Sequence, residues 1–552
     1  MRISGAQAMV RALELEGVTT VFGYPGAAIC PFYDALLDSP IHHVLTRNEQ
    51  GAAHAASGYA RAGHTTGVCI ATSGPGATNL ITGIATAYMD SIPMVAITGQ
   101  VASDLIGSDS FQEADITGAT SPFTKHNYLI NSADELPRVF REAFYLAASG
   151  RPGPVLIDVP VDIQSEMLEF IRPESVELPG YQPKLKPEPE QMLDLRKLLA
   201  ESQRPVVCAG GGVISAGASE PLQQLIDKWQ IPVITTMMGI GSVPADHPRY
   251  LGTMGSHGVF AANFALHHAD CLILLGARVG NRAMGSATAI ARRAKVVHID
   301  IDPAELGKNI RPHLAINADL RQVIAELLTE KPAADWQDWL TETDRLRTQQ
   351  RTRWPCAVMS DHTISPPHLL ERLGSKAPAD TILTTEVGQN QIWAANHYPI
   401  RQAGTFISSG GMGTMGYGLP AALGAQCACP ERQVISISGD GSLQMSLQEL
   451  GTIRQQRLPV RIILLNNSRL GMVHEIQSLK YNQRYSQVFL EENPDFSLLA
   501  AAYGFQYEQI SQNGQIDSAL DHLLTAEGPF FLECVVDPHE PTLYPIAKEE
   551  TP

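Results

Sequence analysis

The sequence lacks three features that would assign a chain to a large class of proteins at once. No apolar run in its 552 residues reaches the length of about 20 residues that crosses a bilayer. Positive charge is not in excess: 40 Lys and Arg stand against 57 Asp and Glu, and the net charge of −17 argues against nucleic acid or anionic lipid as the main partner. The eight cysteines are scattered. Only Cys427 and Cys429 are close, without a second pair or histidine at zinc spacing, so we expect reduced thiols.

The composition is that of a globular protein, with 44% hydrophobic and 18% charged residues. A chain of this length is too long for one hydrophobic core and predicts about three domains. The first helix-like pattern begins within a few residues of Met1, which leaves no room for a targeting peptide. We therefore expect a cytoplasmic protein that binds neither nucleic acid nor membranes.

Short apolar strands alternate with helical stretches in three segments, which predicts an α/β fold of three doubly wound, mainly parallel-sheet domains. We expect these domains at residues 1–165, 190–331 and 365–552. A proline-rich linker, 173–189, separates the first two, and a polar helical connection, 336–354, precedes the third. The predicted strands are 20–22, 67–71, 94–98 and 155–158, then 205–209, 233–236, 271–275 and 295–300, then 381–385, 434–438, 461–466 and 530–536. Ligands of such sheets bind at the carboxyl ends of the strands.

One strand end carries an unusual loop. Gly439-Asp440-Gly441-Ser442 follows the predicted strand 434–438, and Asn466-Asn467 follows the next strand along the chain. Asp440 offers an anionic oxygen and Asn467 a neutral one to a divalent cation, and the glycines allow phosphate oxygens to approach the backbone. A lone Gly-Asp-Gly is usually only a tight turn. Because the second half of the pattern ends the next strand, the pair predicts a magnesium and diphosphate site.

This arrangement resembles the thiamine-diphosphate-binding motif, which runs from Gly-Asp-Gly to Asn-Asn. The resemblance implies that the Asp440 and Asn467 side chains and the Arg469 carbonyl bind Mg²⁺. Nearly the whole chain, and not this motif alone, resembles the acetolactate synthase family of thiamine-diphosphate enzymes. The segments that carry it are Gly23–Ala27, Thr46–Ala53, Thr72–Gly76, Ser110–Asp115, Thr124–His126, Gly411–Gly418 and Arg469–Val473.

Membership of this family would give several residues a catalytic role. A glutamate at a helix start is often only a solvated charge, but the family's glutamate at the position of Glu49 activates the aminopyrimidine of the cofactor. The Gly413 carbonyl and the Met415 side chain hold the cofactor folded. Gln112 and Lys125 are implied to reach the substrate pocket of the neighbouring subunit. The implied thiamine diphosphate contacts are Tyr24, Pro25, Gly26, Thr72, Gly76, Gly388, Gln389, Gly441, Ser442 and Met472.

Glu49 and Asp440 belong to different domains but serve opposite ends of one cofactor. In the resembling family this pairing crosses subunits, which implies a homodimer or homotetramer with its sites at subunit interfaces. Whether a separate regulatory subunit binds is left open.

The resemblance implies a transferase that decarboxylates pyruvate and adds the two-carbon (hydroxyethyl) fragment to a second 2-oxoacid or aldehyde. Phe111, Val473 and Ile476 would line the acceptor pocket. Biosynthetic members typically have a tryptophan in place of Ile476, where it favours 2-oxobutyrate. The acceptor therefore stays open between pyruvate, 2-oxobutyrate and glyoxylate, as does a role in branched-chain amino acid biosynthesis or overflow metabolism.

Loops after three strands of the middle segment resemble the FAD-binding domain of the same family, in which flavin has no net redox role. Glycines after strands are routine in α/β domains, Gly280-Asn281-Arg282 departs from the usual Asp-Asp-Arg, and catabolic members lack FAD. The implied FAD contacts are Arg151, Gly211, Gly212, His257, Arg278, Arg282, Asp300, Ile301 and Asp319. Two alternative functions are a flavin-linked oxidoreductase of the pyruvate oxidase type and a glyoxylate carboligase, which has valine where this chain has Glu49.

Overall fold

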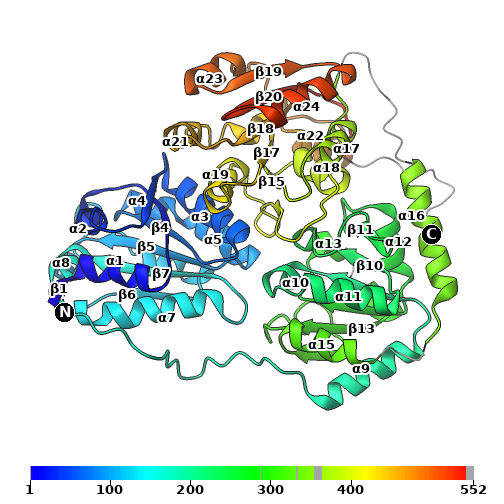
Figure 1. The fold of residues 1–552 in the computed structure, drawn as a ribbon, viewed down its shortest axis with the longest axis horizontal. Coiled ribbons are helices and arrows are strands. Elements are labelled where there is room, and N and C mark those ends of the chain that lie inside the picture. The colour runs from blue at the N-terminus through cyan, green and yellow to red at the C-terminus, as the bar shows by residue number, and fades with distance from the viewer. Residues whose placement is uncertain (1, 286, 331–333, 354–362, 543–552) are drawn as a thin grey trace.

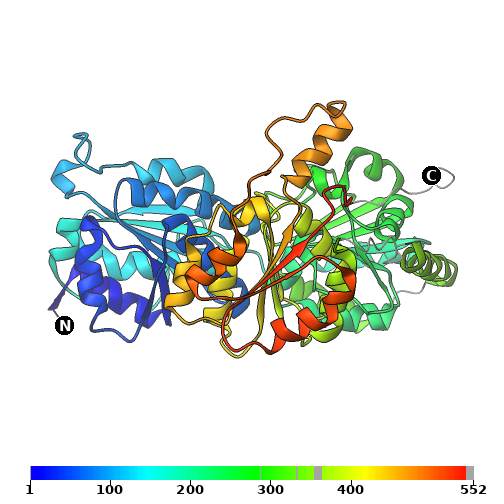
Figure 2. The ribbon, with the colours of Figure 1, turned by 90° about the horizontal axis from the view of Figure 1, so that it is seen from above.

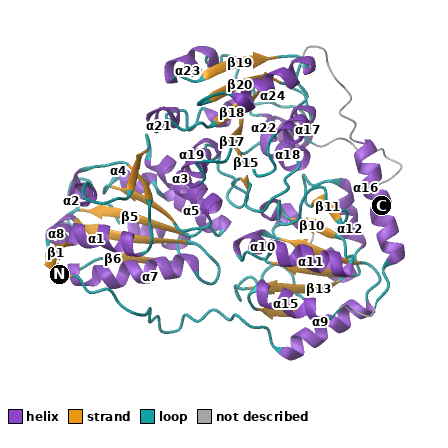
Figure 3. Ribbon diagram, viewed as in Figure 1, coloured by secondary structure: helices purple, strands orange, loops and turns teal. Residues whose placement is uncertain are grey.

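The computed structural model describes residues 2–285, 287–330, 334–353 and 363–542. Its described residues form three sheets of six strands, each with helices on both faces (Figures 1 and 3). All neighbouring strands within these three sheets are parallel. This confirms the predicted α/β fold with parallel sheets.

The first sheet has the strand order β3-β2-β4-β5-β7-β6. Its strands are β2 (Thr20–Gly23), β3 (His42–Leu45), β4 (Gly67–Ala71), β5 (Met94–Gln100), β6 (His126–Leu129) and β7 (Pro154–Pro160). Its helices are α1 (Gly5–Leu15), α2 (Cys30–Leu36), α3 (Glu49–Gly63), α4 (Pro75–Asn79), α5 (Ile81–Asp90), α6 (Ile116–Thr120), α7 (Leu136–Ala148) and α8 (Val161–Ser165). Beside this sheet, β1 (Arg2–Ser4) pairs antiparallel with β8 (Met167–Glu169).

The second sheet has the order β11-β10-β9-β12-β13-β14. Its strands are β9 (Pro205–Ala209), β10 (Val233–Thr235), β11 (Tyr250–Thr253), β12 (Cys271–Leu275), β13 (Lys295–Asp300) and β14 (Leu314–Asn317). Its helices are α9 (Pro189–Glu201), α10 (Gly211–Ser215), α11 (Ser219–Trp229), α12 (Phe260–His268), α13 (Asn281–Met284), α14 (Ala287–Arg293) and α15 (Leu320–Thr329).

The third sheet has the order β16-β15-β17-β18-β20-β19. Its strands are β15 (Ile382–Thr385), β16 (Phe406–Ile407), β17 (Val434–Gly439), β18 (Arg461–Asn466), β19 (Gln506–Ile510) and β20 (Phe530–Val535). Its helices are α17 (Pro366–Lys376), α18 (Gln389–His397), α19 (Gly418–Ala428), α20 (Asp440–Leu443), α21 (Glu449–Gln455), α22 (Gly471–Lys480), α23 (Phe496–Tyr503) and α24 (Ile516–Thr525). Figure 2 shows α22 and the loop after it projecting from the body of the molecule.

Two predicted connections are present. Residues 170–188 contain neither helix nor strand and run as an extended segment from the first sheet to α9 (Figure 1). The helix α16 (Gln337–Arg353) forms most of the predicted polar helical connection, whose last residue, Trp354, lies outside the described residues. Within the described parts of the chain, no helix combines the length and apolar character that crossing a bilayer requires.

The first and third sheets are joined by close packing of α3 against α19. A β-carbon at Gly58 would overlap the main-chain oxygen of Ala421 and lie 2.7 Å from its Cα. A β-carbon at Gly424 would likewise overlap the main-chain oxygen of Ala55. Since these backbones touch directly, the small residues of α3 are required for the approach of the two helices. The buried side chains of both sheets merge there into one hydrophobic core.

Candidate active site

The loops that follow the strands of the second and third sheets face a common cavity of about 1520 Å³. From the second sheet it is lined by residues after β9, β12 and β13, and from the third by residues after β15, β17 and β18. Arg61, Asp90 and Arg151 line it from the first part of the chain. The expectation that ligands meet the carboxyl ends of the strands therefore fits the position of the cavity.

Three oxygen atoms of the third sheet's loops converge in this cavity. Asn467 Nδ2 donates to Gln389 Oε1 at 2.8 Å. In that orientation Asn467 Oδ1 lies 3.2 Å from Asp440 Oδ1 and 2.9 Å from the main-chain oxygen of Arg469. Adjacent ligands of octahedral Mg²⁺, with bonds of 2.0–2.1 Å, are separated by about 3 Å. The donor set and its spacing therefore fit the magnesium ion that the sequence predicted.

The carboxylate of Asp440 is held so that one oxygen faces Asn467. Asn493 Nδ2 donates to the other oxygen, Oδ2, at 2.8 Å. Burial raises the pKa of Asp440 to about 6. Among the described residues, no group of three or more His, Cys, Asp or Glu side chains could hold a metal. A cation bound to Asp440 would therefore need side-chain amide and main-chain oxygens as its other protein ligands.

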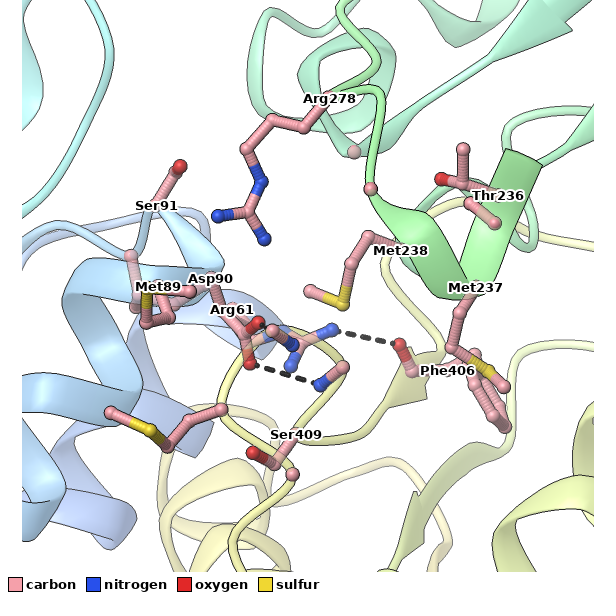
Figure 4. A pocket seen from close by; sticks show the side chains of 18 of the residues that line it. Arg61, Met89, Asp90, Ser91, Thr236, Met237, Met238, Arg278, Phe406 and Ser409 are labelled. Atoms are coloured by element: carbon pink, nitrogen blue, oxygen red, sulfur yellow. Dashed lines mark hydrogen bonds between the residues drawn. The ribbon is translucent and has the colours of Figure 1, made fainter. Parts of the chain in front are cut away.

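The loop of residues 408–417, which carries Gly413 and Met415, is held by side chains from the first part of the chain. Arg61, near the end of α3, donates to the main-chain oxygen of Ser408 at 2.7 Å. Asp90, the last residue of α5, accepts from Gly411 N at 2.6 Å. Figure 4 shows these two side chains side by side next to the loop. Asp90 is buried, and that burial raises its pKa even though Arg61 lies nearby.

The other end of this loop is held from within the third sheet. Glu386 directly follows β15, and its carboxylate accepts from Gly416 N at 2.7 Å and from Leu419 N at 3.2 Å. Complete burial raises the pKa of Glu386 to about 7. Gly413 and Gly416 have φ angles of 72° and 82°, a region that favours glycine. The backbone that presents Gly413 and Met415 to the cavity is therefore fixed at both ends.

Glu49 follows β3 and lies in a second cluster, formed by the segments after the carboxyl ends of β2, β3 and β4. Asn79 Nδ2 donates to Glu49 Oε2 at 2.9 Å, and a β-carbon at Gly76 would lie 3.2 Å from Oε1. A β-carbon at Gly26 would come within 2.5 Å of the Thr72 side chain. Glycine at 76 thus leaves Glu49 Oε1 open to a ligand.

Gln112 belongs to the same cluster, because a β-carbon at Gly74 would lie 2.8 Å from the Gln112 main-chain oxygen. Its φ of 60° is uncommon for a residue other than glycine, and such strain is concentrated at functional sites. Next to it, Phe111 is 87% exposed, and Tyr24 is 42% exposed. None of the five residues Glu49, Gln112, Thr72, Phe111 and Tyr24 is among the described residues that line the cavity. Pro25, Gly26 and Gly76 do not line it either.

Lys125 is not among the described residues that line the cavity. Its ammonium donates to the main-chain oxygen of Ser149, just after α7, at 2.8 Å and to the hydroxyl of Tyr181 in the linker at 3.0 Å. Burial lowers the pKa of Lys125 to about 8. In this chain the side chain ties the linker to α7, and its predicted role in a neighbouring subunit's pocket stays a prediction.

All nine implied FAD residues line the cavity. Arg278 points from the second sheet toward Asp90 (Figure 4), whereas Arg151 is engaged with Asp302 and Glu305 at 3.2 and 2.7 Å. Burial raises the pKa of Asp300 to about 6. The remaining members are Gly211, Gly212, His257, Arg282, Ile301 and Asp319.

The glycines of this region need no ligand to explain them. A β-carbon at Gly212 would lie 2.7 Å from the Cα of Gly276, and one at Gly211 would lie 3.1 Å from the Cβ of Met238. The close approach of the loops after β9 and β12 already requires a glycine at position 212. Support for a second ligand comes instead from the volume of the cavity and from the charged side chains that line it.

The remaining predicted residues of the third sheet line the cavity. Gly388, Gln389, Gly441, Ser442 and Met472 line the cavity beside the three converging oxygens. Val473 and Ile476 line it from α22, and their role in an acceptor pocket stays a prediction. The Gln389 side chain, however, is committed to protein partners, since its amide group bonds Asn467 and Glu475.

The sequence did not identify three acidic residues of the site, Asp90, Glu386 and Glu475. Glu386 directly follows a strand, and that position could have drawn attention to it. Asp90 ends one helix and Glu475 lies within another, without a pattern around them. Their partners come from distant parts of the chain, and only the fold brings them together.

Three family models match the chain. They are described as the thiamine pyrophosphate enzyme N-terminal TPP binding domain, at residues 3–119, the central domain, at 193–327, and the C-terminal TPP binding domain, at 386–534. Fold and site thus define a thiamine pyrophosphate enzyme.

Curated relatives narrow this class. The acetolactate synthase isozyme 2 large subunit of Escherichia coli (strain K12) is 48% identical over 543 residues, covering 97% of this chain and 96% of its own length. The probable acetolactate synthase large subunit of Methanocaldococcus jannaschii is 47% identical over 548 residues, with 98% and 93% covered. The acetolactate synthase large subunit of Lactococcus lactis is 41% identical, with 98% and 94% covered.

The chain belongs to the acetolactate synthase large-subunit family, and it is a thiamine-diphosphate-dependent carboligase, a transferase. This membership does not favour the pyruvate oxidase or glyoxylate carboligase alternative.

Proposed function

We propose that this chain is the catalytic subunit of a magnesium-dependent acetolactate synthase that decarboxylates pyruvate and joins the remaining fragment to a second 2-oxoacid. The convergence of Asp440, Asn467 and the Arg469 carbonyl beside the Gly413–Met415 loop carries the proposal. Thiamine diphosphate supplies the nucleophilic carbon for this chemistry when it is bound. We place the boundaries of the three domains at residues 1–165, 190–331 and 365–552.

The protein's own residues have separate tasks. Asp440, Asn467 and the Arg469 carbonyl would hold Mg²⁺, and the open backbone at Gly441 would admit the diphosphate. Glu49 would hold a proton toward the aminopyrimidine through Oε1, because Asn79 already occupies Oε2. Gly413 and Met415, on the fixed loop, would orient the pyrimidine end.

A second subunit would complete the site. Glu49 and its neighbours Gly26, Thr72, Gly76 and Gln112 form a cluster that does not line the cavity of their own chain. The strongly exposed Phe111 beside them is suited to burial against a partner. A homodimer in which each Glu49 faces the partner's Asp440 is therefore proposed, without a commitment on a separate regulatory subunit.

Two further assignments belong to this proposal. The cavity exceeds the 300–1,000 Å³ usual for one small ligand, and it extends to Arg278, Asp300 and Asp319, which supports FAD as a second cofactor. The absence of a tryptophan at Ile476, which lines the cavity, supports pyruvate rather than 2-oxobutyrate as acceptor. A cytoplasmic role in branched-chain amino acid biosynthesis accords with these assignments.

Product identification tests the proposal. The purified enzyme receives thiamine diphosphate, Mg²⁺ and FAD, and its products are identified with pyruvate alone and with pyruvate and 2-oxobutyrate in competition. We expect acetolactate and CO₂ without oxygen consumption, and little preference for 2-oxobutyrate. Oxygen or quinone reduction, or activity without thiamine diphosphate, would contradict the proposal.

A further inference from the structure

We propose that Glu475 is a positioning residue, which directs the amide oxygen of Asn467 toward the metal through the side chain of Gln389. The inference rests on the magnesium site proposed above and adds a residue that makes no contact with the metal ligands itself. Glu475 lies on α22, one helical turn from Gly471 and next to the acceptor-pocket residue Ile476.

Three side chains form an ordered series of hydrogen bonds. Gln389 Nε2 donates to Glu475 Oε1 at 2.8 Å, and Asn467 Nδ2 donates to Gln389 Oε1 at 2.8 Å. The remaining amide atom, Asn467 Oδ1, then faces Asp440 Oδ1 and the main-chain oxygen of Arg469. The amide oxygen is thereby presented where a cation needs it.

The carboxylate sets the direction of this series. An ionised carboxylate only accepts hydrogen bonds, so Gln389 must present its NH₂ group to Glu475 and its oxygen to Asn467. Gln389 Nε2 also faces the main-chain oxygen of Glu540 at 3.3 Å. Turning the Gln389 amide over would set its oxygen against two acceptors. Turning Asn467 alone would set two amide oxygens 2.8 Å apart.

Without a cation, the reversed Asn467 amide has bonds of its own, because its nitrogen could donate to Asp440 and to the main-chain oxygen of Arg469 at 3.2 and 2.9 Å. It would lose the bond to Gln389 and the bond that Oδ1 accepts from Arg469 N at 3.3 Å. That orientation would block the metal site with an NH₂ group. Glu475 therefore opposes an orientation of Asn467 that competes with metal binding. The side chain that fixes the ligand lies two hydrogen bonds away from the ion.

Glu475 is itself fixed by the chain beyond the third sheet. Thr542 N donates to Glu475 Oε1 at 2.9 Å, and Thr542 Oγ1 donates to Oε2 at 2.8 Å. Trp393 Nε1 donates to the main-chain oxygen of Pro541 at 3.0 Å. These contacts hold the Glu475 carboxylate and the segment 540–542 together beside Gln389.

The metal affinity of the protein measures this role directly. Mn²⁺ serves as the probe, and its free concentration is followed by electron paramagnetic resonance in the presence of full-length apoenzyme and thiamine diphosphate. Loss of a partner that orients a metal ligand typically costs 10–100-fold in metal affinity. We expect Glu475→Ala to raise the Mn²⁺ dissociation constant at least about tenfold. Glu475→Gln should restore most of the affinity, since its oxygen can still accept from Gln389.

We call the hydrogen-bonded series Glu475–Gln389–Asn467 the relay. Exchange of Asn467 for aspartate distinguishes loss of the relay from a general loss of structure at the metal site. A carboxylate presents an oxygen to the metal in either orientation, so it needs no orienting partner. In the Asn467→Asp background, Glu475→Ala should therefore not lower the Mn²⁺ affinity, and it also frees Gln389 to donate to the new carboxylate. Glu491→Ala, which removes the same charge from an exposed position, is the matched control in the wild-type background. Gln389→Met interrupts the relay at its centre and should lower affinity as Glu475→Ala does.

The outcomes distinguish this inference from the proposed function. If Asp440→Asn abolishes Mn²⁺ binding while Glu475→Ala and Gln389→Met leave it intact, the relay is overturned and the metal site stands. An equal loss on Glu475→Ala in the Asn467→Asp background also overturns the relay. Unchanged Mn²⁺ binding by Asp440→Asn would overturn the metal site and the relay with it.

Discussion

Replacing Gly58 by alanine tests the direct contact between α3 and α19. The new methyl group would gain about 1 kcal/mol of helix propensity and about 0.8 kcal/mol from burial of one carbon. Against this, its carbon would overlap the Ala421 carbonyl and lie 2.7 Å from the Ala421 Cα, so the helices must separate. A gap of 0.5–1 Å forfeits a quarter to a half of each dispersion contact, which over such an interface amounts to about 5 kcal/mol. The net effect is a loss of about 3 kcal/mol in the free energy of unfolding.

The matched control is Gly63→Ala on the same helix. A β-carbon there would lie 3.4 Å from the Ala428 Cβ, an ordinary contact, so this variant should be neutral or stabilised by up to about 1 kcal/mol. Urea unfolding followed by far-ultraviolet circular dichroism compares the two midpoints. Because α3 carries Glu49 and Arg61, Gly58→Ala should also lose activity. Equal midpoints for Gly58→Ala, Gly63→Ala and the wild type would refute the packing argument.

Three further predictions concern the site and the first sheet. Glu49→Gln should lower the rate of acetolactate formation by at least about 100-fold with an unchanged unfolding midpoint, and an unaffected rate would remove Glu49 from the mechanism. Ile476→Trp should raise the preference for 2-oxobutyrate over pyruvate about 10-fold or more in a competition assay; an unchanged product ratio would exclude this position from acceptor selection. Asp158 is buried, and burial raises its pKa to about 7, above its usual value; its stabilising contribution is therefore complete at acid pH and is lost as the pH rises through about 7. Asp158→Asn should remove that part of the decline in urea midpoint between pH 4 and 7, and identical pH profiles would refute it.

The strands that sequence reasoning predicted are the inner strands of all three sheets. It missed β3, β6, β11, β14, β16 and β19, and these are the two edge strands of each sheet. An inner parallel strand is buried on both faces and has a continuous apolar sequence. Edge strands such as β3, which begins His42-His43, and β19, which reads Gln506-Tyr507-Glu508-Gln509, lack that signal.

A similar distinction applies to the site. That Asp440 and Asn467 lie close together was predictable, because each directly follows a buried strand of the same parallel sheet. The contact of Glu475 with Gln389, on which its proposed orienting role rests, was not predictable, since it depends on which amide atom of Gln389 faces which neighbour. Nor could the sequence show that Lys125 bonds the end of α7 and the linker, because those partners are distant along the chain.

Subunit complementation tests the central claim most directly, namely that Glu49 of one subunit and Asp440 of the other build one cofactor site. Glu49→Gln and Asp440→Asn subunits, each inactive alone, are mixed, dissociated and reassembled. Half of the dimers should then be hybrids with one intact site of two, so about a quarter of the wild-type activity should return. No recovery in verified hybrids would contradict the account and place Glu49 and Asp440 of one chain in the same site.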